Sequence, residues 1–263
     1  MLRRISTRLK QHGWFGVAID LTVVVAGILI ALQLDAWAER REQHRLERVY
    51  LQRLAEDFEI ERSRMEAAQR YANARIEAAR FLGRILEDPR VAAAEPARVP
   101  WALETATWRS FPQINAFVYR ELQSTGRLVL LSSESLRRNL AEHYTALQHD
   151  ARVGEDLTAQ QRFDGAVAGL LTIDELEAVE RVAGDHHQLS MTPDRALAVA
   201  RSFAQRPSAI AELPSLVQHH TFNLRVISAM RQRADDILQQ IDSLMSSNGR
   251  SRPRLRVRGP ASG

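Results

Sequence analysis

The sequence predicts an all-α protein in which one N-terminal transmembrane helix continues into a bundle of long helices. Three observations lead to this fold class. One apolar stretch near the N-terminus is long enough to span a bilayer. Later segments repeat apolar residues every three or four positions, the period of a helix with one buried face. The one strand-like run, RLVLLSS, has no partner strand with which to pair.

The apolar stretch covers residues 14–37 and carries no charge between Asp20 and Asp35. A transmembrane helix needs about 20 mostly apolar residues, because each residue rises about 1.5 Å and the hydrocarbon core is about 30 Å thick. Trp14 and Trp37 lie at the two ends, where indole rings favour the boundary between water and lipid. We therefore expect Trp14, Asp20 and Trp37 at the membrane interface, with membrane lipid as a partner.

A cleaved signal peptide is the alternative interpretation of this N-terminus. Residues 1–13 form a basic tail, and Ala36-Trp37-Ala38 resembles a small-x-small cleavage site. The apolar core of a signal peptide has about 7–15 residues, fewer than here, so a retained anchor is favoured. Arginines flank both ends of the stretch, so the positive-inside rule decides little. A basic tail before a single span is typical of a signal anchor and predicts a cytoplasmic N-terminus.

The domain that follows covers residues 38–246 and begins with a long helix. Arg and Glu fill much of its exposed surface, as on a solvated face, and Pro89 ends it. Glu61 and Arg75 interrupt its apolar stripe as polar gaps. The stripe itself steps by three and four residues through Leu51, Leu54, Phe58, Met65, Ala68, Ala72, Ala79, Leu82 and Leu86.

Shorter elements follow this helix. Helices are predicted over residues 101–109 and 115–125, the second ending at Gly126 in a left-handed cap. Residues 128–131 are interpreted as a buried connector. Ser132 or Ser133 then caps a long helix that runs to residue 152, or in its longest form to residue 171.

Two further helix starts carry recognisable caps. Thr172 with Glu175 has the spacing of a capping box. Thr192 precedes Pro193, which sits at a first helical position where its missing N–H costs nothing.

Pro207 and Pro214 are predicted to break the chain before a last helix over residues 215–246. Packing of its apolar seam against the first long helix is favoured over a separate coiled coil, because the seam spans few heptads. Residues 247–263 have the composition of a disordered tail, with Arg at every second position from 250 to 258. The seam consists of Ile227, Met230, Ala234, Ile237, Ile241 and Leu244.

Composition excludes several chemistries. The chain has no cysteine, which rules out disulfides, thiolate catalysis and Cys-ligated metals. The formal net charge of +4 is weak evidence for an anionic partner. The Arg-rich tail is interpreted as a solvated tail, with anionic lipid as an alternative partner, or nucleic acid if the domain is cytoplasmic.

No catalytic, cofactor-binding or metal-binding residue is predicted. The His186-His187 and His219-His220 pairs invite a metal interpretation, but adjacent residues on a helix point about 100° apart. His143 lies next to Glu142 and not at a ligand spacing. The sequence contains no phosphate-binding glycine loop and no nucleophile elbow.

Two polar residues of the apolar stretch, Asp20 and Gln33, suggest either simple residence at the interface or association with another span. Ala26, Gly27 and Ala31 offer small side chains for close helix approach, although they are not a strict GxxxG motif. A protein partner or a homo-oligomer is therefore expected.

Two sequence blocks resemble a group of uncharacterised bacterial membrane proteins that share a domain of unknown function. The first reads Asp20, then GILIALQ over residues 27–33, Trp37, and Tyr50-Leu51-x-x-Leu54-x-x-Asp57. The group tends to carry Glu where this chain has Asp20. The second block has Tyr119-x-Glu121-Leu122-x-Ser124-x-Gly126-x-Leu128, followed by Leu136-Arg137 and Tyr144. The resemblance implies a single N-terminal span and a helical domain, and no activity. With the cytoplasmic N-terminus expected of a signal anchor, the protein is predicted to lie in a bacterial inner membrane with its domain in the periplasm.

The function expected from these observations is that of a structural or protein-interaction module. Gln33, Tyr119, Glu121, Gly126 and Tyr144 are its candidate interaction or packing residues, with packing favoured for the last four. A sensor-like module that signals through a partner's span is the alternative, and a metal-dependent enzyme is a remote one.

Overall fold

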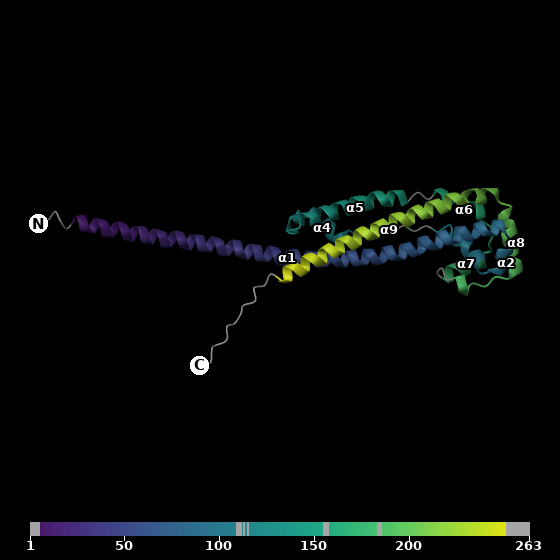
Figure 1. Ribbon diagram of the computed structural model, residues 1–263, viewed down its shortest axis with the longest axis horizontal. Helices are drawn as coiled ribbons and strands as arrows, with labels where there is room; N and C mark the ends of the chain where they lie inside the picture. Colours follow the sequence, from purple (N-terminus) through teal and green to yellow (C-terminus); the bar gives the residue numbers. More distant parts are fainter. Residues whose placement is uncertain are drawn as a thin grey trace, which may run out of the picture.

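The protein is described by a computed structural model that covers residues 6–108, 112, 114, 116–154, 158–182 and 186–250. Helix α1, Ser6–Glu87, runs the whole length of the molecule as one unbroken element (Figure 1). Its first half extends alone, whereas its second half forms one side of the bundle. The chain is thus all-α throughout its described part, and the expected N-terminal helix does continue into a long-helix bundle.

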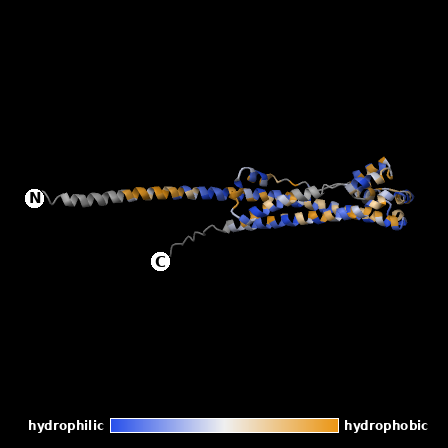
Figure 2. Cartoon of the chain, turned by 90° about the horizontal axis from the view of Figure 1, so that it is seen from above, coloured by the Kyte–Doolittle hydropathy of each residue, from blue (hydrophilic) through white to orange (hydrophobic). Residues whose placement is uncertain are grey.

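The isolated half of α1 exposes every large apolar side chain that the structure describes between residues 21 and 37 (Figure 2). A stretch of this helix, within Leu21–Glu87, is long and apolar enough to cross a membrane, and none of that stretch is buried against the protein. Residues 6–13 of the expected basic tail belong to the same helix. The exposed apolar residues here are Leu21, Val23, Val24, Val25, Ile28, Leu29, Ile30, Leu32, Leu34 and Trp37.

The remaining elements fold back along the second half of α1. Helix α9 lies antiparallel to α1 and forms the most extensive helix pair of the molecule, and α5 covers the two at the end nearer the isolated half (Figure 1). The short helices gather mainly at the far end, except α4 and η1, which lie with α5. Their bounds are α2 Arg90–Ala94, α3 Arg98–Thr105, α4 Phe117–Ser124, η1 Arg127–Leu130, α5 Glu134–Gly154, α6 Thr158–Val167, α7 Ile173–Arg181, η2 His186–Gln188, α8 Pro193–Ala204 and α9 Pro207–Arg250.

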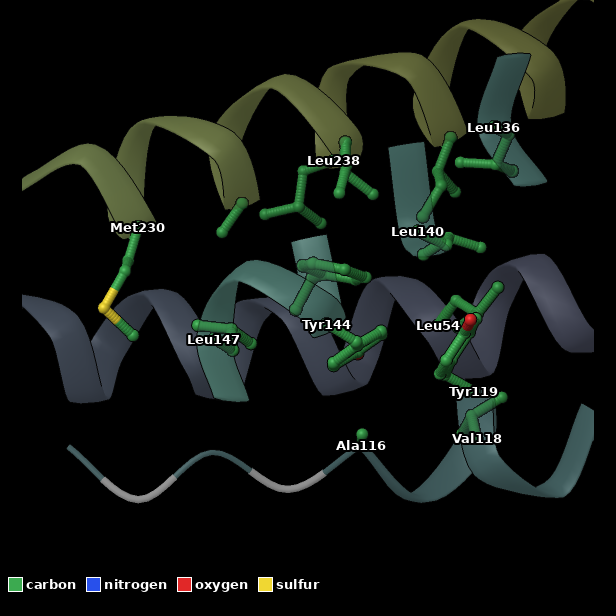
Figure 3. Packing of buried hydrophobic residues seen from close by; sticks show 14 of the residues in the cluster. Leu54, Ala116, Val118, Tyr119, Leu136, Leu140, Tyr144, Leu147, Met230 and Leu238 are labelled. Carbon is green, nitrogen blue, oxygen red and sulfur yellow. The ribbon is translucent and has the colours of Figure 1, made fainter. Parts of the chain in front are cut away.

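Two apolar clusters form the core, one at each end of the bundle. The near cluster joins residues 50–72 of α1, which carry most of the predicted stripe, to the predicted seam of α9, with α4 and α5 closing it (Figure 3). The far cluster joins residues 78–85 of α1 to α2, α3, α6, α7, α8 and the first part of α9. The expected packing of the last helix on the first is therefore confirmed. Contact between the two apolar stripes removes their surface from water, which stabilises the pair.

Several expected helix ends match the structure. The Ser133 hydroxyl accepts a bond from the N–H of Leu136 and caps α5. Thr172 and Glu175 form the expected capping box. Gly126 has φ of 67°, the left-handed conformation that favours glycine, and turns the chain from α4 into η1.

Two local expectations were wrong. Residues 128–131 are not a buried connector, because η1 is a 3₁₀ turn on the surface whose Val129 is 78% exposed, and only Leu131 is buried. Pro214 does not break the chain before the last helix but lies inside α9, which begins at Pro207 rather than at residue 215. Leu213 and Leu216 on either side are buried in the far cluster, so their packing offsets the hydrogen bond that a proline cannot donate.

Candidate functional site

The two polar gaps of the α1 stripe both face the core. Glu61 is 3% exposed and Arg75 is 1% exposed, although both belong to residue types that are rarely buried without a partner. Each lies one helical step from buried apolar neighbours of the same stripe, so the helical period directs them inward. The structure gives each of them polar partners from a distant part of the chain.

Glu61 pairs with His143 of α5. The His143 Nε2 atom lies 2.7 Å from Glu61 Oε1, and His143 is 1% exposed. A carboxylate oxygen accepts and an imidazole N–H donates, so the tautomer with its proton on Nε2 fits this bond. This bond links α1 to α5 in the interior, where aromatic rings surround it.

An aromatic cluster surrounds the pair. Phe58 lies 5.2 Å from the His143 ring and Tyr144 lies 5.1 Å from it, between ring centroids. Tyr119 of α4 stacks on Tyr144 at 4.6 Å, and Figure 3 shows both rings between the helices. Burial raises the pKa of the Tyr144 phenol, and the nearby carboxylate of Glu61 adds to the effect. We call Phe58, Glu61, Tyr119, His143 and Tyr144 the central cluster.

Two polar atoms of the central cluster have no hydrogen-bond partner among the described residues. They are Nδ1 of His143 and the hydroxyl of Tyr144, both shielded from solvent. A buried polar atom without a partner costs free energy, and an ordered water or a bound group can supply the missing bond. The central cluster combines two such atoms with a buried Glu–His pair, and we take it as the candidate functional site of the bundle.

A second polar group lies at the other gap. Arg75 donates to the carbonyls of Tyr71 and Trp108, and burial lowers its pKa to about 10. His220 of α9 donates through Nε2 to the carbonyl of Ala106 at 3.2 Å. The pKa of His220 is lowered to about 4, chiefly by burial and next by the charge of Arg75, while the bond to Ala106 opposes both. These residues tie the segment after α3 to both long helices.

Polar side chains of α1 also hold α4 in place. Arg53 forms a two-bond ion pair with Glu121, at 3.1 and 2.6 Å, and Tyr50 donates to the same carboxylate. Arg127 of η1 donates in turn to the Tyr50 hydroxyl. The bond to Arg53 holds the pKa of Glu121 below its ordinary value, followed by the bond from Tyr50. Glu121 thus joins α4 to α1 at the near end.

Two more carboxylates of α1 receive backbone N–H groups at helix starts. Asp57 accepts from the N–H of Val118 at 3.1 Å, in the first turn of α4. Glu47 accepts from the N–H of Ser132 at 2.6 Å, just before α5. These N–H groups have no partner within their own helices, and the positive end of each helix favours the negative charge. Asp57 and Glu47 therefore tie the starts of α4 and α5 to α1.

The predicted residues of the apolar stretch are only partly described. Gln33 and Trp37 are exposed, and Arg41 lies over the Trp37 ring at 5.4 Å from its centroid. Trp14 and Asp20 belong to α1, but their side chains lie outside the described part of the structure. Residues 251–263 of the Arg-rich tail also lie outside it, and α9 continues to Arg250.

The histidine pairs do not gather metal ligands within the described residues. His219 bonds to Asn223 at 2.9 Å and His220 to a backbone carbonyl. The part of the chain that the structure describes contains no group of three His, Asp or Glu placed to hold a metal ion.

The sequence identified Tyr119, Glu121 and Tyr144 as candidates, but it did not identify Glu61 and His143 as a buried hydrogen-bonded pair. The signal that finds Glu61 is its place at a core position of a helical stripe. His143 has a similar signal, since it follows Leu136 and Leu140 of α5 by seven and three residues.

Comparison of the chain with protein-family models, with curated proteins and with solved structures gives no match. The resemblance carried by the two sequence blocks therefore stays a prediction.

Proposed function

We propose that the protein is a single-span, membrane-anchored helical module whose bundle serves a structural or protein-interaction role. The observation that carries this proposal is the division of α1 into two halves. Its N-terminal half exposes a long apolar surface that no part of the described protein covers, and its C-terminal half is central to the bundle core. Lipid is the natural cover for such a surface, because its side chains are apolar. A helix tolerates lipid, because the backbone groups in its interior are hydrogen-bonded to one another.

The continuity of α1 explains how such a module would work. The helix contains no proline, so the bundle is held at a defined height above the membrane. From residue 21 on, where the side chains of α1 are described, the first buried one is Glu47, about 15 Å along the axis from Trp37 at about 1.5 Å per residue. A bundle raised on a rigid helix is suited to presenting a surface to a second protein or to a second copy of this chain.

The location and the partners are further parts of this proposal. We place the span in a bacterial inner membrane with the N-terminus in the cytoplasm and the bundle in the periplasm. Membrane lipid and a protein partner or second copy are its partners, and nucleic acid enters only if the bundle is cytoplasmic. No catalytic role, cofactor or metal is part of the proposal.

Alkaline carbonate washing of membranes tests the anchor. The wild-type chain is expected to stay in the washed pellet, with a C-terminal tag digested by protease added to spheroplasts. A double change in the apolar half, I28R with I30R, is expected to release the protein, since each Arg within a span costs about 2.5–3.5 kcal/mol. The matched control V49R with I60R places the same charges on exposed apolar positions of the bundle half and should leave the protein in the pellet.

Release of the wild-type chain by carbonate would contradict the anchor. Retention with a tag protected until lysis would contradict the periplasmic placement alone and move the bundle to the cytoplasm. Both results are read from the same membrane preparation.

A sensor-like module is the second candidate, favoured by the unpartnered His143 Nδ1 and Tyr144 hydroxyl in the central cluster. A small polar ligand bonded there would act directly on α1, the helix that carries the span. Native mass spectrometry of the full chain in mild detergent tests this function. A retained small molecule that is lost in H143F supports it, and an empty wild-type chain argues against it.

A further inference from the structure

One side of α1 carries exposed apolar residues along the bundle. Between residues 38 and 87, all of which the structure describes, the large apolar side chains that stay exposed are Val49, Ile60 and Tyr71, at 42%, 53% and 46%. They follow one another at intervals of eleven residues, which is close to three turns of a helix. They therefore lie on one side of α1 over a length of about 33 Å. We call these three residues the outer stripe.

The outer stripe faces away from the core. Phe58, which is buried in the near cluster, lies two residues from Ile60, and two residues turn about 200° around a helix. The polar contacts of α1 with α4 and α9 start from residues beside the stripe, Asp57 and Glu66. Figure 1 shows α9 and α5 together on one side of α1. The described part of the chain therefore leaves the outer stripe uncovered.

The same interval continues into the isolated half of α1. Counting back from Val49 by eleven residues gives Ala38 and then Gly27, and both are exposed. A Cβ atom added at Gly27 would meet nothing within 4 Å. An eleven-residue apolar repeat favours right-handed winding of two helices, and small residues within a span favour right-handed crossing. One continuous face of α1 is thus suited to a second helix lying alongside it.

The charges beside the outer stripe match a parallel second copy of the chain. Arg45 and Glu42 precede Val49 by four and seven residues, and Arg53 and Glu56 follow it by the same steps. Glu42 and Arg53 consequently lie on one side of the stripe, and the other two lie on the opposite side. A twofold axis parallel to α1 places each side against the opposite side of the second chain. Carboxylates then face guanidinium groups within one helical turn, which favours this orientation.

We propose that a second copy of this chain packs against the outer stripe, with the two α1 helices parallel and wound right-handed about each other. This inference rests on the proposed membrane anchor and selects the second copy among the partners that the anchor proposal allows. An anchor gives both chains one orientation and one height, so each residue of the stripe meets its own counterpart. The two bundles then stand side by side on one membrane.

Cysteine crosslinking tests this interface, because the chain has no cysteine of its own. V49C and I60C are oxidised separately in membranes that contain the full chain, with R48C and E59C as controls. Each control is the exposed sequence neighbour of a stripe residue, at nearly the same height but about 100° away around α1. We expect disulfide-linked dimers at V49C and I60C, where the two Cβ atoms can come within the roughly 3.5–4.5 Å that a disulfide needs, and several-fold less at the controls.

Sedimentation equilibrium of the purified full chain in mild detergent measures the strength of the contact. V49N with I60N should raise the dissociation constant of the dimer about a hundredfold, because four half-exposed apolar side chains, two from each copy, lose their apolar partners. The matched control R48N with E59N places the same two amides on neighbouring exposed positions without changing the net charge. This control should leave the dissociation constant unchanged.

Equal crosslinking at all four positions would indicate random collisions and overturn the proposal, as would a folded wild-type chain that stays monomeric. A photoreactive residue in place of Ile60 identifies the occupant in cells. A product at twice the mass of the chain supports the second copy, whereas a product of another mass overturns it in favour of a different protein. Release of the chain by carbonate would overturn the anchor and this inference together, and a retained chain without dimers would overturn the dimer alone.

Discussion

The buried pair of Glu61 and His143 should dominate the stability of the near end of the bundle. Both side chains are almost fully buried, and their bond is 2.7 Å long. In H143L the carboxylate stays in an apolar core without its partner, which is expected to cost about 3–5 kcal/mol. In E61L the imidazole N–H loses its acceptor, which should cost about 1–3 kcal/mol.

The double variant E61L with H143L removes both polar groups and replaces them with leucines of similar size. Apolar replacement of a whole buried pair is often close to neutral, so this variant should be more stable than H143L and close to the wild type. The expected coupling free energy, the cost of the two single variants less that of the double, is therefore several kcal/mol. E61Q is a further control, because its amide oxygen still accepts from His143 and should cost less than E61L.

Urea unfolding of the full chain in detergent, followed by circular dichroism at the helix signal, measures these free energies. The four proteins of the cycle are compared at one pH and one detergent concentration. Additive single-variant effects would refute the reasoning, because two residues that act through one bond must couple. A double variant less stable than either single variant would also refute it.

Four further predictions concern other parts of the bundle. His220 should make the protein lose stability as pH falls from about 6.5 toward about 4, because the imidazole binds a proton in the unfolded chain more readily than in the folded core. The loss in the free energy of unfolding approaches about 3 kcal/mol. H220N should flatten the dependence of this free energy on pH, measured by urea unfolding at several pH values. G126A should lower the free energy of unfolding by about 1–2 kcal/mol, since its φ is 67°, whereas G83A, in the middle of α1, should not lower it. P214A should stabilise α9 by up to about 3 kcal/mol, seen as a higher denaturation midpoint, and an unchanged midpoint would contradict a helical Pro214. I237A, at the contact of α9 with α1, should cost about 2–5 kcal/mol, far more than an exposed change such as I60A.

The helices that local patterns determine could be predicted from the sequence. The apolar stripe of α1 and the seam of α9 predicted the two long helices and their contact. Apolar residues repeated at the helical period mark the face that is buried, and this period can be read directly from the sequence. The caps at Ser133 and Thr172 and the turn at Gly126 were also accessible, since each depends on residues within one helical turn. The error at Pro214 arose because tertiary packing of its neighbours overrides a local rule.

The central cluster could be predicted only in part. Glu61 stood out as a polar gap, but its partner His143 lies in another helix, and the sequence does not say which face of α5 meets α1. The same holds for Asp57 and Glu47, whose partners are backbone N–H groups at the starts of α4 and α5. Interactions between distant segments depend on the docking of whole helices, which periodicity alone does not specify.

The central claim is that one unbroken helix passes from the bilayer into the bundle core, and a spin-label scan along α1 tests it most directly. Single cysteines are introduced in turn from residue 21 to residue 48 of the cysteine-free chain in nanodiscs, and collisions with oxygen and with a water-soluble nickel chelate are measured. We expect oxygen to dominate from residue 21 to about residue 34 and the chelate beyond about residue 40, with a helical period of about 3.6 residues appearing where the bundle begins to cover one face near Glu47. Strong collisions with the chelate at residues 26–30 would contradict the account, because that part of α1 would then lie in water.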